Sequence, residues 1–168
     1  MTGRMAVVTT AHSWGDPRVF ERELAACLEW GVEVHVFVPL AEPPARSGWS
    51  AAPGLCVQAD PERLFQVFSN LLGNALKFTP VGGVIEVIAE ATGDEVLFRV
   101  CDNGVGIDPA QLPYIFDRYW TSRVGNPTGS GLGLYISHGI IEAHGGTLWA
   151  ESVLGQGSVF SFRISAGG

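Results

Sequence analysis

The spacing of apolar residues after position 60 predicts an amphipathic helix. Apolar side chains recur three and four residues apart and form one stripe, which consists of Leu64, Val67, Phe68, Leu71, Leu72, Ala75 and Leu76. A second stripe is polar and consists of Arg63, Asn70, Asn74 and Lys77. Asp60-Pro61 favours a helix start, and the helix should end at Thr79-Pro80 because the residue before a proline avoids the α region. One face suits a core, and the other is left for solvent or a ligand.

The rest of the C-terminal part predicts an antiparallel strand pair, two helices and a closing pair of strands. Hydrophobicity alternates from Val84 to Ala91 and from Val96 to Cys101, on either side of "TGD". A short helix is expected from Pro109 to about Tyr119. A longer one is expected from Gly131 to about His144, where Gly145 is placed for a left-handed C-cap. The segments "TLWAES" and "SVFSFRI" read as the last two strands.

The N-terminal part predicts a separate β-α-β unit followed by a linker. Met5 to Thr10 and Val32 to Val38 read as strands, and a helix begins between them at Asp16-Pro17. The next stretch is rich in Pro, Ala, Ser and Gly, so we expect a boundary near Arg46 to Trp49. The predicted domains are residues 1–48 and 49–168. The small unit leaves a sheet face and edges uncovered, so we expect it to dock on the following sheet, self-associate or stay loosely ordered.

Composition and charge narrow the class of protein. Hydrophobic residues make up 46% and charged residues 16% of the 168 residues, which favours a folded globule. No apolar run approaches the length of a membrane span, and no basic segment followed by an apolar one opens the chain. The net charge of −7 opposes a nucleic-acid partner. The cysteines, Cys27, Cys56 and Cys101, show no metal-binding spacing, so a reduced, cytosolic protein is expected.

The polar stripe of the first predicted helix is a candidate site for Mg²⁺ and phosphate. An amide oxygen is a neutral, hard ligand that suits Mg²⁺ shared with substrate phosphates, so Asn74 is the candidate ligand and Asn70 a second one. Lys77, one turn further on, could contact the same phosphates. The alternative is a solvated face, and the helix by itself favours that alternative.

The segment "CDNGVGID" offers a second candidate site. Asp102 stands at a strand end and could accept a hydrogen bond from an exocyclic amine, while Gly104 and Gly106 let the backbone approach a flat ring closely. Adenine fits that description. Asn-Gly is also a strong hairpin signal, but a helix start follows instead of an alternating strand, so the hairpin is less favoured.

The glycine-rich "TGSGLGLYI" leads directly into a predicted helix, whose first N–H groups could bind an anion. The signal is weak by itself. It is not a P-loop, because no Lys-Ser/Thr follows, and it lacks the third glycine of a dinucleotide fingerprint. In "YIFDRYW", Arg118 could reach a γ-phosphate, and a solvated Arg118 beside a packed Phe116 and Tyr119 is equally expected.

Taken in order, these motifs resemble the ATP-binding catalytic domain of sensor histidine kinases, in the GHKL ATPase superfamily. The resemblance covers residues 55–164, with "NLLGNALKF" similar to the N box, "DNGVGI" to the G1 box, "IFDRYW" to the F box and "GSGLGLYI" to the G2 box. It implies an α/β fold, a two-layer sandwich of the GHKL (Bergerat) type with helices over a mixed sheet. It also implies ATP and Mg²⁺ as ligands.

The resemblance implies a role for each candidate residue. Asn74 would ligate Mg²⁺ with help from Asn70, and Lys77 would contact phosphate. Asp102 would bind the adenine amine, and the groups around the ring and along the phosphates would be Phe78, Gly104, Gly106, Gly131, Leu132 and Gly133. Related ATPases have an acid where this chain has Asn70, so transfer to a protein acceptor is expected in place of rapid hydrolysis.

In the family the acceptor is a histidine on a helical dimerisation domain, which passes the phosphoryl group to a response regulator. The four histidines here have no such setting, so we expect a catalytic domain whose acceptor lies elsewhere. Two alternatives stay open, an anti-sigma-type serine kinase and a non-catalytic nucleotide-binding or interaction module. Residues 5–39 resemble the N-terminal β-α-β unit of GT-B glycosyltransferases, which makes a natural or artificial fusion conceivable.

Overall fold

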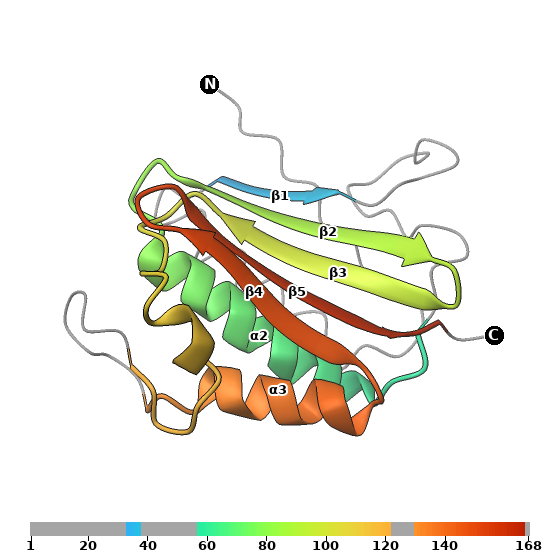
Figure 1. The fold of residues 1–168 in the computed structure, drawn as a ribbon. Coiled ribbons are helices and arrows are strands. Elements are labelled where there is room, and N and C mark those ends of the chain that lie inside the picture. Colours follow the sequence, from blue (N-terminus) through green and yellow to red (C-terminus); the bar gives the residue numbers. More distant parts are fainter. Residues whose placement is uncertain (1–32, 38–56, 122–129, 167–168) are drawn as a thin grey trace.

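The protein is a two-layer α/β sandwich in a computed structural model that describes residues 33–37, 57–121 and 130–166 (Figure 1). One layer is a sheet of β1 (Glu33–Phe37), β2 (Val84–Thr92), β3 (Glu95–Asp102), β4 (Thr147–Val153) and β5 (Gly157–Ser165), in the order β1-β2-β3-β5-β4. The other layer contains the helices α2 (Pro61–Phe78) and α3 (Gly133–Ala143). The predicted fold class is thereby confirmed.

Helix α2 begins and ends where the sequence predicts. The Oδ1 atom of Asp60 accepts hydrogen bonds from the N–H groups of Glu62 and Arg63, and Thr79 leaves the helix with an extended backbone. The apolar stripe of the helix is buried in the core. Within the described segments, no helix combines the length and hydrophobicity that crossing a bilayer requires.

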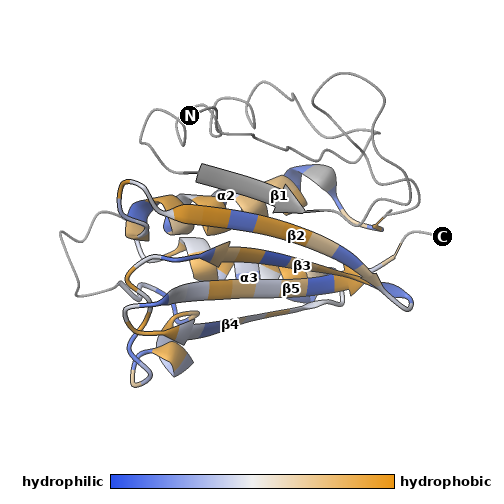
Figure 2. Ribbon diagram, turned by 90° about the horizontal axis from the view of Figure 1, so that it is seen from above, coloured by the Kyte–Doolittle hydropathy of each residue, from blue (hydrophilic) through white to orange (hydrophobic). Residues whose placement is uncertain are grey.

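Strands β2 and β3 bury alternate residues against the helices. Figure 2 shows β2 as mainly hydrophobic, with hydrophilic bands along it. The antiparallel register places Val87 opposite Val100. Three aromatic rings join the layers: the ring centroids of Phe98 and Phe162 are 4.8 Å apart, and Phe68 of α2 lies edge-on to both. Edge-to-face pairs of this kind stabilise a core beyond the area that they bury.

The prediction of a short helix from Pro109 to about Tyr119 is wrong. The structure has only a 3₁₀ helix, η1 (Leu112–Tyr114), with turns on both sides. Tyr114 N–H donates to the carbonyl of Gln111, and Asp117 N–H donates to the carbonyl of Tyr114, so the hydrogen bonds span three residues. Pro113 would lie in the interior of the expected helix, where its missing N–H and its ring disfavour a regular α-helix.

Strand β1 comes from the segment that predicts the second strand of the N-terminal unit. It pairs in parallel with β2, with Glu33 opposite Val84 and Phe37 opposite Ile88. Helix α2 lies between these two strands in the chain, as a parallel connection requires. The other predicted parts of the N-terminal unit, residues 5–10 and 16–31, and the linker lie outside the described residues. The boundary near residue 48 stays a prediction.

Candidate functional site

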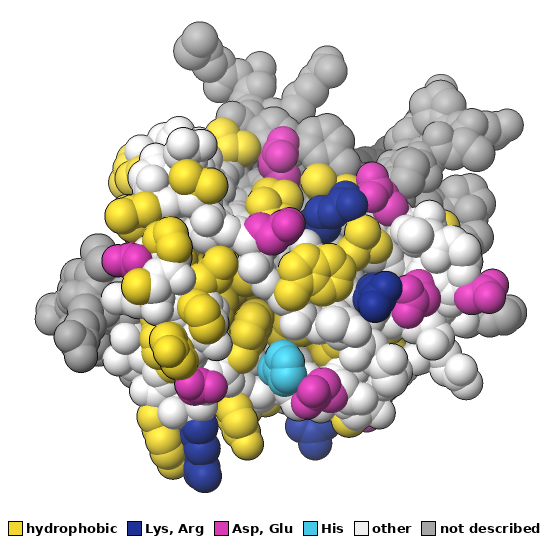
Figure 3. Space-filling view, viewed as in Figure 1, with side chains coloured by type: hydrophobic (Ala, Val, Ile, Leu, Met, Phe, Trp, Pro, Cys, Tyr) yellow, Lys and Arg dark blue, Asp and Glu magenta, His cyan; other side chains and the backbone are white. Residues whose placement is uncertain are grey.

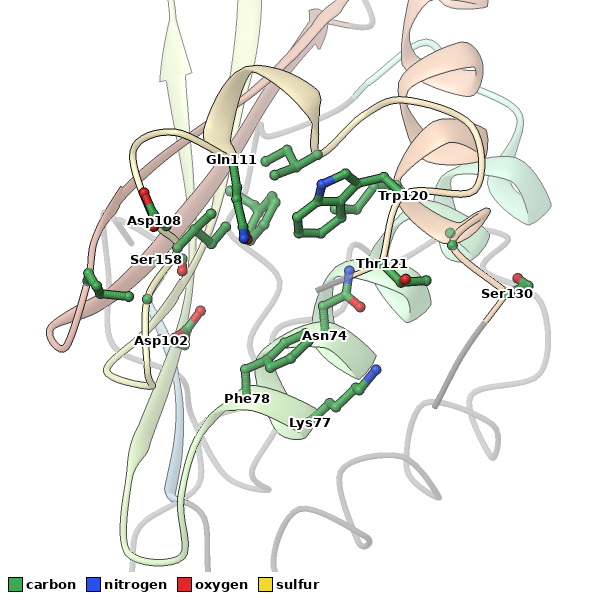
Figure 4. Close-up of a pocket in the computed structure, with 18 residues that line it drawn as sticks. Asn74, Lys77, Phe78, Asp102, Asp108, Gln111, Trp120, Thr121, Ser130 and Ser158 are labelled. Carbon is green, nitrogen blue, oxygen red and sulfur yellow. The ribbon is translucent and has the colours of Figure 1, made fainter. Parts of the chain in front are cut away.

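A cavity of about 400 Å³ opens between the last turns of α2, the loop after β3 and the first turn of α3 (Figure 4). Its volume is within the range of small-molecule sites. Seven of the predicted site residues line it: Asn74, Lys77, Phe78, Asp102, Gly106, Gly131 and Gly133. The predicted residues that do not line it are Asn70, Gly104, Arg118 and Leu132.

Asp102 ends β3, and its carboxylate points into the cavity (Figure 4). Its Oδ1 accepts a hydrogen bond from Gly104 N–H at 2.9 Å. Burial raises the pKa of this carboxyl above its usual value, and the backbone N–H groups of Gly104 and Ser158 offset part of that rise. Because the carboxylate is partly removed from water, a donor on a ligand would interact with it more strongly than with a solvated acid.

The loop after Asp102 is packed tightly on two sides. Gly106 has a φ of +67°, and a Cβ added there would lie 2.2 Å from the carbonyl oxygen of Val153. Gly104 does not face the cavity, and a Cβ there would lie 2.3 Å from the carbonyl oxygen of Phe78. The two glycines therefore let the loop lie against the β4–β5 turn and the end of α2, which fixes the backbone beside Asp102.

The last turns of α2 form the wall across from Asp102 (Figure 4). Asn74 is half-buried, and its side-chain amide has no hydrogen-bond partner among the described residues. Lys77 is exposed, with Nζ 5.0 Å from the ring centroid of Phe78. Asn74 and Lys77 are three residues apart and therefore share one face of the helix. This wall presents a free amide and a positive charge to the cavity.

Asn70 lies one turn before Asn74 and links the two helices. Its Nδ2 donates to the carbonyl oxygen of Gly133 and to Ser137 Oγ, both at 3.1 Å. Ser137 is fully buried. Asn70 therefore positions the first turn of α3 beside α2, and its Oδ1 has no hydrogen-bond partner in the described part of the chain.

Gly131 and Tyr119 bring together the two ends of residues 120–130. Tyr119 N–H donates to the carbonyl oxygen of Gly131 at 3.0 Å, and both residues have a φ of +67°. A Cβ at Gly131 would lie 2.6 Å from the carbonyl oxygen of Trp120, so glycine is required for this approach. Arg118 is exposed, with its guanidinium 4.8 Å from the Tyr119 ring centroid. Leu132 is the N-cap residue of α3.

Several lining residues were missed by sequence reasoning. Ser158 and Phe160 lie on the buried face of β5, and Ser158 pairs with Asp102 in the sheet register, so strand alternation could have identified both. Trp120 belongs to the quoted "IFDRYW" segment, yet no role was predicted for it. Gln111 gave no signal, because the segment around it was predicted to be a regular helix.

Exposed hydrophobic side chains surround this end of the molecule. Figure 3 shows them toward the left of the drawn face, where Figure 1 places the loop after β3 and the β4–β5 turn. The large ones in these segments are Val105, Tyr114, Tyr119, Val153 and Leu154. Leu154 also lines the cavity, so the solvent side of the cavity has an apolar rim.

Comparison with known proteins gives a consistent result. Residues 59–167 match the family model described as histidine kinase-, DNA gyrase B- and HSP90-like ATPase. The adaptive-response sensory kinase SasA of Synechococcus elongatus is 45% identical over 108 residues, which is 63% of this chain and 28% of SasA. The chain therefore spans about a quarter of the length of this relative.

Solved histidine kinases share the fold. The nucleotide-free catalytic domain of ThkA superimposes with a TM-score of 0.71 at 27% identity, covering 89% of this chain and 90% of that domain. ThkA is also known in complex with the response regulator protein TrrA. Full-length ShkA in complex with AMPPNP gives a TM-score of 0.70 at 28% identity, covering 96% of this chain and 33% of ShkA.

Proposed function

Because the chain belongs to the family of histidine kinase-, DNA gyrase B- and HSP90-like ATPases, we propose that its cavity binds ATP with Mg²⁺ as the catalytic domain of a sensor histidine kinase. The γ-phosphoryl group would pass to a histidine on a separate acceptor domain. One observation carries the proposal: Asp102 and Asn74 line the same cavity from opposite sides (Figure 4).

The charges around the cavity favour one orientation of the nucleotide. Asp102 and Asp108 line one side, and an anionic phosphate chain is repelled from two carboxylates. Lys77 and the N-terminus of α3 at Gly133 line the other side, where a positive charge and free N–H groups attract anions. The base would therefore lie at Asp102, with its amine donating to the carboxylate, and the phosphates would lie beside α2 and α3.

The residues at the phosphate side fit Mg²⁺, which prefers hard oxygen ligands and retains several waters. Asn74 has an unpartnered amide, and the Nδ2 bonds of Asn70 leave its Oδ1 available. The described residues contain no group of three or more His, Cys, Asp or Glu that could hold a metal by themselves. The Mg²⁺ ion would therefore be held mainly by phosphate oxygens and water, and the ion would neutralise the charge of the phosphates. Asn74 would hold the ion and Asn70 would assist.

Phosphoryl transfer depends mainly on alignment and charge neutralisation, which these residues can supply. An amide at position 70 cannot take a proton from water as a carboxylate does, so hydrolysis is disfavoured. His138 Nδ1 lies 3.3 Å from a carboxylate oxygen of Glu142, and both ring nitrogens of His144 are in hydrogen bonds. Neither histidine lines the cavity. Among the histidines whose side chains the structure describes, none is placed to accept the phosphoryl group, which supports an accepting imidazole on another domain, with a response regulator as the next acceptor.

Calorimetric titration with AMPPNP, with and without Mg²⁺, tests the nucleotide site. We expect micromolar to millimolar affinity for wild type, and binding about tenfold to a hundredfold weaker in Asp102→Ala, since hydrogen bonds to charged groups contribute about 1.5–3 kcal/mol. Asp94→Asn, in the β2–β3 turn outside the cavity, is the matched control. Identical titrations for wild type and Asp102→Ala would refute the assignment of the site.

Phosphotransfer in trans tests the enzyme class. The protein is incubated with ATP, Mg²⁺ and a histidine-bearing dimerisation domain of a sensor kinase, and a serine-bearing anti-sigma antagonist serves as the alternative acceptor. Acid-labile label on the first acceptor and negligible turnover without it are expected for a cytoplasmic histidine kinase domain. Acid-stable label on the serine protein would instead favour a serine kinase.

A further inference from the structure

Gln111 lines the cavity, and its side chain makes no hydrogen bond or ion pair with the described part of the chain. Its backbone makes the turn around η1: its N–H donates to the Asp108 carbonyl at 2.8 Å, and its carbonyl accepts from Tyr114 N–H at 2.9 Å. The side chain makes no capping hydrogen bond, and no other interaction of it is found. It is half-buried and points into the cavity (Figure 4). A partly desolvated amide without a protein partner is satisfied by water or by a ligand, so this amide is available to a molecule that enters the cavity.

The position of Gln111 selects the part of the ligand that it can reach. Figure 4 shows its amide between the Asp102 and Ser158 side and the Trp120 and Asn74 side. In a nucleotide that is bound with its base at Asp102 and its phosphates at Asn74, the group between them is the ribose. This step rests on the proposed function.

The chemistry of the amide also fits a sugar. Its oxygen can accept a hydrogen bond from a hydroxyl, and its NH₂ group can donate one to a hydroxyl. The amide carries no positive charge that would attract a phosphate. Much of the neighbouring wall is apolar, formed by Ile107, Ile115 and Trp120. Asp108 also lines the cavity, but it is exposed and its Oδ1 accepts from Ala110 N–H at 2.8 Å.

We infer that Gln111 recognises a ribose hydroxyl of the bound nucleotide and makes the site selective for ribonucleotides over deoxyribonucleotides. A site that is built to hydrogen-bond a hydroxyl rejects an analogue that lacks it, because its own polar group is then left unpaired.

The test compares the affinities of ATP, 2′-deoxy-ATP and 3′-deoxy-ATP, each with Mg²⁺, by calorimetry. Wild type should bind ATP about threefold to tenfold more tightly than at least one deoxy analogue, the range that one neutral hydrogen bond supplies. Gln111→Met has a side chain of similar length without the amide, and it should bind all three nucleotides equally. Gln156→Met makes the same change in the exposed β4–β5 turn and should keep the wild-type preference.

Each outcome decides one proposal. Equal affinity of wild type for the three nucleotides, or an unchanged preference in Gln111→Met, would overturn the role of Gln111 and leave ATP binding intact. Because wild type alone can give the first of these results, the inference stays testable even if the variant does not fold. Failure of wild type to bind any of the nucleotides would overturn the proposed function itself, and this inference with it.

Discussion

The Asp102 end of the cavity rests on paired strands, whereas the Asn74 end is assembled from two helices and a loop. Asp102 and Ser158 are partners in the β3–β5 register, and Gly106 is packed against Val153. At the other end, Asn70 of α2 makes two hydrogen bonds to α3. The base end is therefore fixed by the core of the fold, and the phosphate end depends on individual polar side chains.

The largest expected loss of stability comes from disturbing the packing at the base end of the cavity, beside Asp102. Gly106→Ala places a methyl group against the Val153 carbonyl at a positive φ, so we expect a loss of about 3 kcal/mol in the free energy of unfolding, and loss of nucleotide binding. Gly93→Ala is the matched control, because Gly93 has a φ of +63° and open space around its Cβ position. It should lose only about 1 kcal/mol. Similar losses in urea denaturation of the two variants would show that the close packing at Gly106 is unimportant.

At the phosphate end, we expect the substitution Asn70→Asp to lower the free energy of unfolding by about 2 kcal/mol. Asn70→Asp removes the donor to Gly133 and turns a carboxylate toward that carbonyl oxygen, which leaves the carbonyl without its partner and repelled, while the Ser137 hydroxyl can still donate to the carboxylate. Asn103→Asp is the control, because Asn103 Oδ1 accepts from Val84 N–H and a carboxylate can still do so. It should change the unfolding free energy by less than about 0.5 kcal/mol. If Asn70→Asp is equally harmless in urea denaturation, the amide does not join α2 to α3 as described.

The charge of Asp102 predicts a smaller, pH-dependent effect on stability. Since its pKa is raised in the folded protein, the folded state binds the proton more tightly than the unfolded state, whose carboxyl titrates near 3.8. The contribution of Asp102 to stability therefore falls as the pH rises from the unfolded value through the raised, folded one.

Asp102→Asn keeps the oxygen that accepts from Gly104 N–H and removes this titration. It should be as stable as wild type at low pH and more stable at neutral pH, which thermal unfolding across the acid range can measure. A variant that is less stable than wild type at neutral pH would contradict the burial of an unpaired carboxylate at this position.

The smallest expected effect is that of Arg118→Gln on the affinity for ATP. Arg118 is exposed and does not line the cavity, so Arg118→Gln should change the affinity for ATP by less than about twofold, as expected for a surface substitution. Lys77→Gln, which does alter the cavity, is the comparison and should weaken ATP binding in a salt-dependent way. A loss of affinity in Arg118→Gln for ATP but not for ADP would instead place its guanidinium at the γ-phosphate.

The sequence predicted the elements that rest on periodicity. The apolar stripe of α2, the alternation of β2 and β3, and the left-handed Gly145 at the end of α3 all report local geometry, and the structure confirms them. Asp102 was also identified correctly as the residue at the end of a strand. These features depend on neighbouring residues in the chain, which a single sequence contains.

Features that depend on distant residues were not predictable in the same way. The polar stripe of α2 does not reveal that Asn70 contacts α3 while Asn74 faces the cavity, because both lie on one helical face and the position of α3 decides between them. The parallel pairing of β1 with β2 was not predicted, and docking of the N-terminal unit on the following sheet was only one of three expectations for that unit. The segment around Gln111 was predicted wrongly because Pro113 interrupts an otherwise helix-like pattern.

The central claim is that Asp102 and Asn74 hold opposite ends of one ATP molecule. Calorimetric titration of ATP and of purine riboside triphosphate, which lacks the 6-amino group, with and without Mg²⁺, tests it in wild type, Asp102→Asn and Asn74→Ala. Asp102→Asn should lose the preference for the amino group and keep the Mg²⁺ dependence, and Asn74→Ala should do the reverse. If both substitutions alter the same preference, or neither alters any, the two residues do not bind separate ends of the nucleotide.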